Sequence, residues 1–117
     1  MTYDRFEDLP VWQAAIKLCH AVFDLVDDRA FTPLGDLRNQ LQRAALSISN
    51  NIAEGSGSDS PIEFSHFLNI AHLSAFETAH IVLFLHSKSM LANPGQDRLL
   101  TQFEEVCRMI TGFRRSL

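Results

Sequence analysis

Residues 60–89, SPIEFSHFLNIAHLSAFETAHIVLFLHSKS, are apolar almost throughout. Ser60 and Pro61 predict a helix start, because serine caps a helix and the fixed φ of proline suits the first turn. Glu63 follows Ser60 at the spacing of a capping box. The expected helix, Pro61–Ser89, has an apolar core stripe at helical spacing. This stripe consists of Phe64, Leu68, Ala71, Ala75, Ala79, Val82 and Leu85.

Other apolar side chains of this segment point in further directions around the helix, and its only charged residues are Glu63, Glu77 and Lys88. A helix that is apolar nearly all round is buried on more than one side. We therefore expect further copies of the chain to cover the second apolar surface; the alternative is a monomer with a wide core stripe. The expected oligomer interface contains Val11, Leu18, Ile70, Leu73, Ile81 and Phe84.

Three further segments carry helix signals. Proline follows a capping residue at Thr32 and Asn93, and Pro10 suits a first turn. These helices are expected from about Asp8 to Asp28, from Thr32-Pro33 to Gly55, and from Asn93-Pro94 to Leu117. The expected core stripe of the first is Trp12, Ala15, Ile16, Cys19, Phe23 and Val26. No stretch alternates as a strand does, so we predict one domain, residues 1–117, folded as an all-α, antiparallel up-down four-helix bundle.

The composition supports a globular protein: of 117 residues, 46% are hydrophobic and 21% are charged, which excludes disordered and collagen-like classes. Cys19 and Cys107 lack CxxC spacing, and the first residues are acidic where a secretory signal is basic. We therefore expect a reducing cytoplasm. The longest aliphatic or aromatic run, Ile81–Leu85, is far shorter than the roughly 20 residues of a membrane span. No membrane partner is expected.

Two Glu-x-x-His pairs, Glu63 with His66 and Glu77 with His80, match the spacing of di-iron carboxylate bundles. Both pairs lie on one helix, about 21 Å apart, so they cannot share a metal pair within one subunit. We interpret them as surface or interface histidines. The alternative is a metal-dependent enzyme that uses Glu77 and His80. The sequence has no nucleophile elbow or Cys/His signature, and we expect no enzyme activity, cofactor, metal or small-molecule substrate.

Asn51 continues the apolar seam of the second helix, where an apolar residue would be typical. A buried asparagine in such a seam fixes helix register or partner choice, and this is our interpretation; the alternative is an exposed polar helix end. The glycines and serines of residues 55–58 follow a helix and include no lysine, which favours a connector over a phosphate-binding loop.

Basic residues lie on the second helix and near the C-terminus. Because the net charge is −4, the molecule as a whole repels phosphate backbones, and nucleic acid could bind only through a local cluster. The competing interpretation is scattered, solvated charge. The alternative function is therefore a direct nucleic-acid binder that uses Arg38, Arg43, Arg108, Arg114 and Arg115.

Three stretches, FEDLPVWQAA at residues 6–15, QLQRAALSISNNIAEG at residues 40–55 and EFSHFLNIA at residues 63–71, resemble the four-helix bundle family of the 23S rRNA intervening-sequence proteins. The resemblance extends over nearly the whole chain. It implies a small bacterial protein that forms ring-like pentamers and acts as an interaction or RNA-associated accessory protein. The similar accessory variability determinants of diversity-generating retroelements bind nucleic acid and a reverse transcriptase through basic surfaces.

This chain differs from the family pattern at two places. Ser49 stands where the family usually has proline, and Gln42-Arg43 stands where it has two arginines. The lost cation and the negative net charge both weaken the case for nucleic-acid binding.

Overall fold

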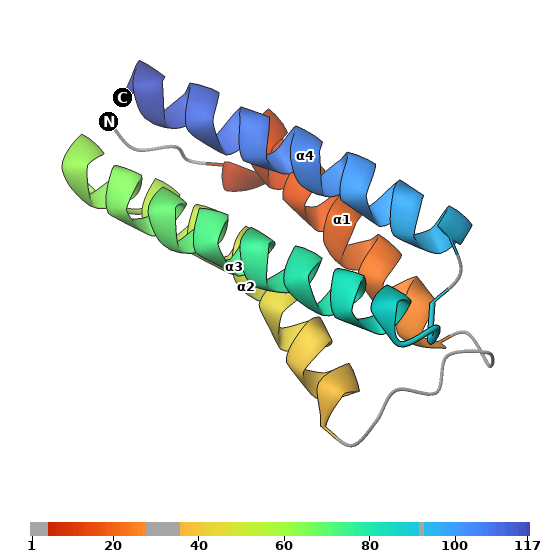
Figure 1. Ribbon diagram of the computed structural model, residues 1–117. Coiled ribbons are helices and arrows are strands. Elements are labelled where there is room, and N and C mark those ends of the chain that lie inside the picture. Colours follow the sequence, from red (N-terminus) through yellow and green to blue (C-terminus); the bar gives the residue numbers. More distant parts are fainter. Residues whose placement is uncertain (1–4, 28–35, 92) are drawn as a thin grey trace.

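The computed structural model describes residues 5–27, 36–91 and 93–117. A 3-10 helix, η1 (Phe6–Asp8), precedes four α-helices, and none of the described residues forms a strand. The helices are α1 (Pro10–Asp27), α2 (Leu37–Ser56), α3 (Pro61–Ser87) and α4 (Asn93–Ser116). Each packs against its neighbours in the order α1, α2, α3, α4 and back to α1 (Figure 1). The predicted all-α four-helix bundle is confirmed, with α1 diagonal to α3 and α2 diagonal to α4.

The start of α3 follows the sequence signal. Ser60 is extended, with φ of −117°, and its side-chain oxygen accepts a hydrogen bond from the Glu63 amide at 3.3 Å. The end of α3 lies two residues before the expected Ser89. Ser89 itself has φ of +58°, and the Met90 amide donates to the Leu85 carbonyl at 2.8 Å, which closes the helix as a Schellman-type cap does.

The expected C-terminal limit of α2 needs correction, whereas its expected start is not tested. The Thr32-Pro33 start lies outside the described residues, and the described helix begins at Leu37, after Asp36. Gly55 does not end α2, because the helix continues to Ser56. Gly55 is instead buried against α3, where a Cβ atom would lie 2.8 Å from Phe64 Cδ1. The glycine therefore permits close packing of the two helices.

The core stripe of α3 lies where the sequence predicted it. All seven of its side chains are buried, and they pack against apolar residues of α2 and α4. On α4, Leu99, Val106 and Ile110 are buried and Phe103 is partly buried. Near the end of α4, the Phe113 ring lies 5.2 Å from that of Phe64.

The predicted core stripe of α1 is rotated by about one residue. The structure buries Val11, Ala15, Leu18, Cys19, Val22 and Val26, whereas Trp12, Ile16 and Phe23 are only partly buried. The two possible stripes share Ala15, Cys19 and Val26, so spacing alone does not separate them. Packing of α1 between α2 and α4 selects the observed one.

Three residues expected at an oligomer interface belong instead to the core of the single chain. Val11, Leu18 and Ile81 are 3%, 1% and 3% exposed. Val11 and Leu18 are buried because of the rotated stripe of α1. Ile81 is buried because α3 also packs against α2, and Ser74 and Thr78 on the same side of α3 are buried with it. The sequence interpretation is corrected at these three positions.

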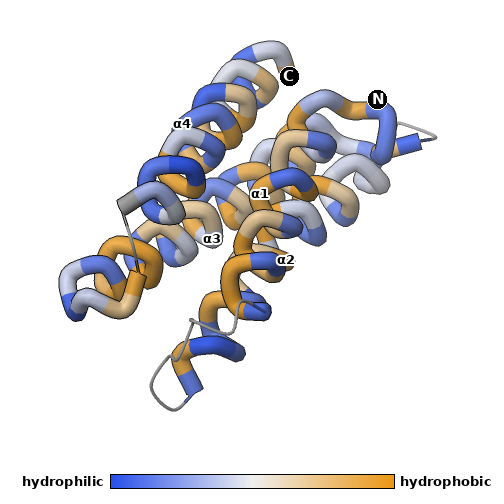
Figure 2. The backbone as a smooth tube through the Cα atoms, turned by 90° about the vertical axis from the view of Figure 1, so that its right-hand side faces the viewer, coloured by the Kyte–Doolittle hydropathy of each residue, from blue (hydrophilic) through white to orange (hydrophobic). Residues whose placement is uncertain are grey.

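Figure 2 shows apolar residues in successive positions around the C-terminal part of α3, whereas apolar and polar residues alternate along α4. By length and composition α3 could cross a membrane, although the sequence predicted no such span. However, 44% of its most apolar window is buried inside the bundle. Length and composition do not distinguish a membrane span from the core helix of a soluble protein.

Candidate interaction surface on α3

A second apolar stripe runs along α3 on the side opposite its core stripe. Successive residues of an α-helix are about 100° apart, so residues two positions from the core stripe lie roughly 200° away from it. We call this surface the outer stripe. It consists of Ile62, His66, Asn69, Leu73, Phe76, His80 and Leu83, with Phe84 at its edge.

The large apolar side chains of the outer stripe are exposed in the single chain. Ile62 is 84%, Leu73 60% and Phe76 53% exposed, and Leu83 and Phe84 are exposed as well. The positions of the whole stripe, including the polar His66, Asn69 and His80, follow the alternating steps of four and three residues that are typical of a coiled-coil seam. The helix therefore carries a second seam, which the bundle covers only in part. The Phe76 ring packs against that of Phe103 on α4, with centroids 5.3 Å apart, but remains 53% exposed.

The outer stripe continues onto α2. The hydroxyls of Ser47 on α2 and Ser74 on α3 are 2.9 Å apart and hold the two helices together. Leu46 and Leu73 each precede one of these serines, and both are exposed. Leu46 therefore borders the outer stripe near its middle.

A small cavity lies beside the C-terminal end of the outer stripe. It has a volume of about 220 Å³ and is lined by Leu37, Gln40, His80, Ile81 and Phe84. These residues come from the start of α2 and the C-terminal part of α3. The surface here is hollow and mainly apolar, a shape that accepts a protruding side chain of a partner helix.

Of the interface residues predicted from sequence, Leu73 and Phe84 are exposed on or beside the outer stripe, and Ile70 is half-buried. Ile62, Phe76 and Leu83 were not among the interface residues predicted from sequence. A signal was available for Ile62 and Leu83, which lie two residues from Phe64 and Leu85 of the core stripe.

Asn51 is buried, so the interpretation as an exposed helix end does not hold. Its side-chain amide donates to the Ser47 carbonyl at 2.8 Å and to the Ser47 hydroxyl at 3.0 Å. Asn51, Ser47 and Ser74 thus form a polar network between α2 and α3. A role of Asn51 in fixing helix register stays a prediction.

Two of the candidate nucleic-acid-contacting arginines bind other side chains of the same chain. Arg43 pairs with Asp36 at 3.4 Å on the surface. The Arg114 guanidinium donates to Ser65 Oγ at 3.2 Å and lies 3.5 Å from Asn69 Oδ1. Arg114 therefore connects α4 to α3.

The candidate arginines do not converge on one site. Arg38 and Arg43 lie near the start of α2, whereas Arg108, Arg114 and Arg115 lie near the end of α4. The Phe64–Phe113 contact places the end of α4 beside the start of α3, which follows the end of α2. The end of α4 is therefore at the same end of the bundle as the end of α2, and the start of α2 is at the opposite end (Figure 1). The two groups of arginines thus lie at opposite ends of the bundle, on helices that are also diagonal.

The Glu-x-x-His residues lie on α3, and among the described residues no three His, Cys, Asp or Glu side chains are grouped as a metal site. Glu63, His66, Glu77 and His80 are exposed, so their chemistry belongs to the surface.

Both cysteine thiols are free, and Cys19 is buried whereas Cys107 is partly buried. Burial raises the pKa of Cys19 and raises that of Cys107 to about 11. A nucleophilic cysteine requires the opposite shift, because the reactive species is the thiolate.

A family model described as 23S rRNA-intervening sequence protein matches residues 7–112. No curated protein matches the chain. Among solved structures, the chain is similar to a protein of unknown function from the S23 ribosomal protein family of Bacteroides thetaiotaomicron VPI-5482. The TM-score is 0.79 at 19% identity, and the match covers 89% of this chain and 97% of the other. This likeness supports the fold.

Proposed function

The chain belongs to the 23S rRNA-intervening sequence protein family, and we propose that it is a non-enzymatic accessory protein of the cytoplasm that works as a homo-oligomer. Neither the family description nor that of the structural neighbour names an enzymatic activity. The raised thiol pKa values and the surface positions of the histidines support a binding role over a catalytic one.

The outer stripe is the observation that carries this proposal. Soluble monomers rarely expose several large apolar side chains along one helix face. Covering Leu73, Phe76 and Leu83 removes apolar surface from water, which stabilises association by about 25 cal/mol per Å² before the entropic cost of binding. A second copy of the chain is the proposed cover, since the coiled-coil spacing of the stripe suits another helix.

We further propose that the copies form a closed ring of five, in line with the family resemblance. A ring with an odd number of copies requires a heterologous contact, in which two different patches meet. The outer stripe supplies one patch. Among the described residues, Phe6 is the large exposed apolar residue that lies apart from the outer stripe and its border at Leu46, and it is the candidate for the other patch.

The test is a set of charge substitutions read by light scattering. Leu73→Asp and Phe84→Asp place a carboxylate in the proposed contact, where it would be buried without a partner, and should shift the protein to monomer. Thr101→Asp, on the exposed side of α4, is the matched control and should keep the wild-type mass. Far-UV circular dichroism should show folded helices for all three. If both variants keep the wild-type mass, the outer stripe is not the interface.

RNA association is a second candidate, favoured by the exposed Arg108 and Arg115 at the end of α4. One copy offers few phosphate contacts, but a ring repeats them. RNA binding should therefore weaken steeply with salt in the wild type and fall further in the monomeric Leu73→Asp variant. If the wild type and Leu73→Asp bind RNA equally well, RNA binding does not depend on assembly.

A further inference from the structure

A cavity lies between α1 and α4, in the part of the bundle formed by the second half of α1 and the first half of α4. Its volume is about 570 Å³, within the range of roughly 300–1,000 Å³ typical of small-molecule sites. Because α1 is diagonal to α3, the cavity is separate from the outer stripe. Neither the assembly nor the RNA contact proposed above uses it.

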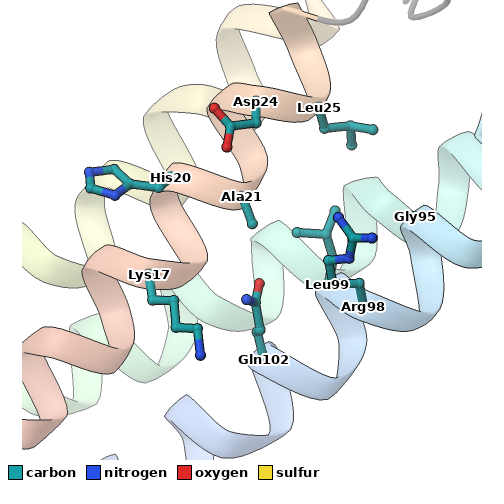
Figure 3. A pocket seen from close by; sticks show the side chains of 9 residues that line it. All are labelled: Lys17, His20, Ala21, Asp24, Leu25, Gly95, Arg98, Leu99 and Gln102. Atoms are coloured by element: carbon teal, nitrogen blue, oxygen red, sulfur yellow. The ribbon is translucent and has the colours of Figure 1, made fainter.

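Two cations from facing helices line this cavity. Figure 3 shows Lys17 on α1 and Arg98 on α4 with their charged ends toward the space between the helices. Neither side chain has an ion pair or a hydrogen bond with any residue that the structure describes. Gly95, in the first turn of α4, also lines the cavity, and the positive end of the helix dipole adds to the two charges there. The electrostatics therefore favour an anion.

Gln102 adds a polar group without a partner. Its side chain reaches from α4 toward α1 (Figure 3). The buried Oε1 atom has no hydrogen bond among the described residues. A buried amide oxygen loses its hydration, and a hydroxyl or N–H group of a ligand would restore a hydrogen bond.

The remaining walls set the shape and polarity of a ligand. Ala21, Leu25 and Leu99 give the cavity an apolar surface on which a carbon skeleton can lie. Asp24 and His20 also line it, and in Figure 3 they point away from α4 and form the rim. Asp24 is the only carboxylate among the lining residues, and it disfavours additional negative charge at the rim.

We propose that this cavity binds a small phosphomonoester that also carries hydroxyl groups. The dianionic phosphate lies between Lys17 and Arg98, which together supply two charge-assisted contacts. A ligand hydroxyl donates to Gln102, and the carbon skeleton covers Ala21 and Leu25. Sugar phosphates and nucleoside monophosphates share this chemistry.

Isothermal titration calorimetry of the full chain tests the proposal with four probes: glucose 6-phosphate, AMP, inorganic phosphate and glucose. We expect one or both esters to bind more tightly than inorganic phosphate, and glucose not to bind. The tighter ester tells whether a sugar or a nucleoside is preferred. Lys17→Ala and Arg98→Ala should each weaken ester binding by about tenfold or more. Gln102→Leu should weaken ester binding while leaving the weak binding of inorganic phosphate unchanged.

Lys88→Ala is the matched control, because Lys88 is an exposed cation at the end of α3 that does not line the cavity. It should keep wild-type affinity. Lys17 and Arg98 are also exposed, so their variants should fold, as circular dichroism would verify. The proposal is overturned if neither ester binds at millimolar concentration. It is also overturned if Lys17→Ala and Arg98→Ala bind as the wild type does, or if Lys88→Ala loses equal affinity.

Discussion

Gly55 on α2 and Phe64 on α3 approach so closely that no side chain fits between them. A Cβ atom at residue 55 would lie 2.8 Å from Phe64 Cδ1 and 2.7 Å from Phe67 Cβ. This approach brings the end of α2 against the start of α3. It makes the glycine a packing requirement rather than a helix terminator.

Gly55→Ala should therefore lower the free energy of unfolding by roughly 1–3 kcal/mol, the usual cost of overpacking a core. Gly112→Ala is the matched control, because a Cβ atom at residue 112 of α4 meets nothing within 4 Å. It should stabilise the helix by about 0.5–1 kcal/mol. Urea denaturation of both variants measures the contrast, and a neutral Gly55→Ala would show that α3 can move away.

The hydrogen bond between Ser47 and Ser74 should contribute to stability. We expect Ser47→Ala and Ser74→Ala each to lower the free energy of unfolding by about 1 kcal/mol, because both hydroxyls lie in the partly buried contact between α2 and α3. The double variant should lose less than the sum, which a double-mutant cycle measures. Strict additivity of the two losses would mean that the hydroxyls act independently.

Ser89 has a left-handed backbone conformation that glycine adopts more easily. Ser89→Gly should raise the free energy of unfolding by roughly 1 kcal/mol, since a side chain at positive φ costs about 1–2 kcal/mol. Ser87→Gly, in the last turn of α3, should instead destabilise the protein. Thermal denaturation compares the two variants, and the same sign for both would contradict the cap geometry.

Alkaline pH should destabilise the protein partly through Cys107. Burial raises the pKa of its thiol from 9.0 to about 11, so the folded state keeps a proton that the unfolded state releases. The associated stability is complete below pH 9 and is lost as pH rises toward 11.

Cys107→Ala should therefore lose less stability than the wild type between pH 8 and pH 10.5, as measured by urea denaturation. The buried Cys19 thiol, whose pKa is also raised, remains in both proteins and contributes equally. An unchanged pH dependence would mean that Cys107 has the same pKa in the folded and unfolded states.

Local signals in the sequence predicted much of the fold. The Ser60-Pro61 start and the core stripe of α3 were correct because capping and spacing act within one helix. The stripe of α1 was misplaced because two registers share Ala15, Cys19 and Val26, and only packing between α2 and α4 separates them. The burial of Ile81 likewise depends on the position of a neighbouring helix.

The candidate sites depend even more on tertiary structure. Exposure of Leu73 and Phe84 could be expected from the excess of apolar residues on α3. In contrast, Lys17 and Arg98 lie far apart in the sequence, and only the packing of α1 against α4 brings them to one cavity. The separation of the arginines on α2 and α4 has the same origin, because spacing along one helix says nothing about which helices are diagonal.

Sedimentation velocity of the wild-type protein at micromolar concentration tests the proposed assembly most directly. If neighbouring copies cover the outer stripe, the protein should sediment as a single species with about five times the chain mass of 13.2 kDa. A single species of 13.2 kDa that persists as the concentration is raised would contradict the account.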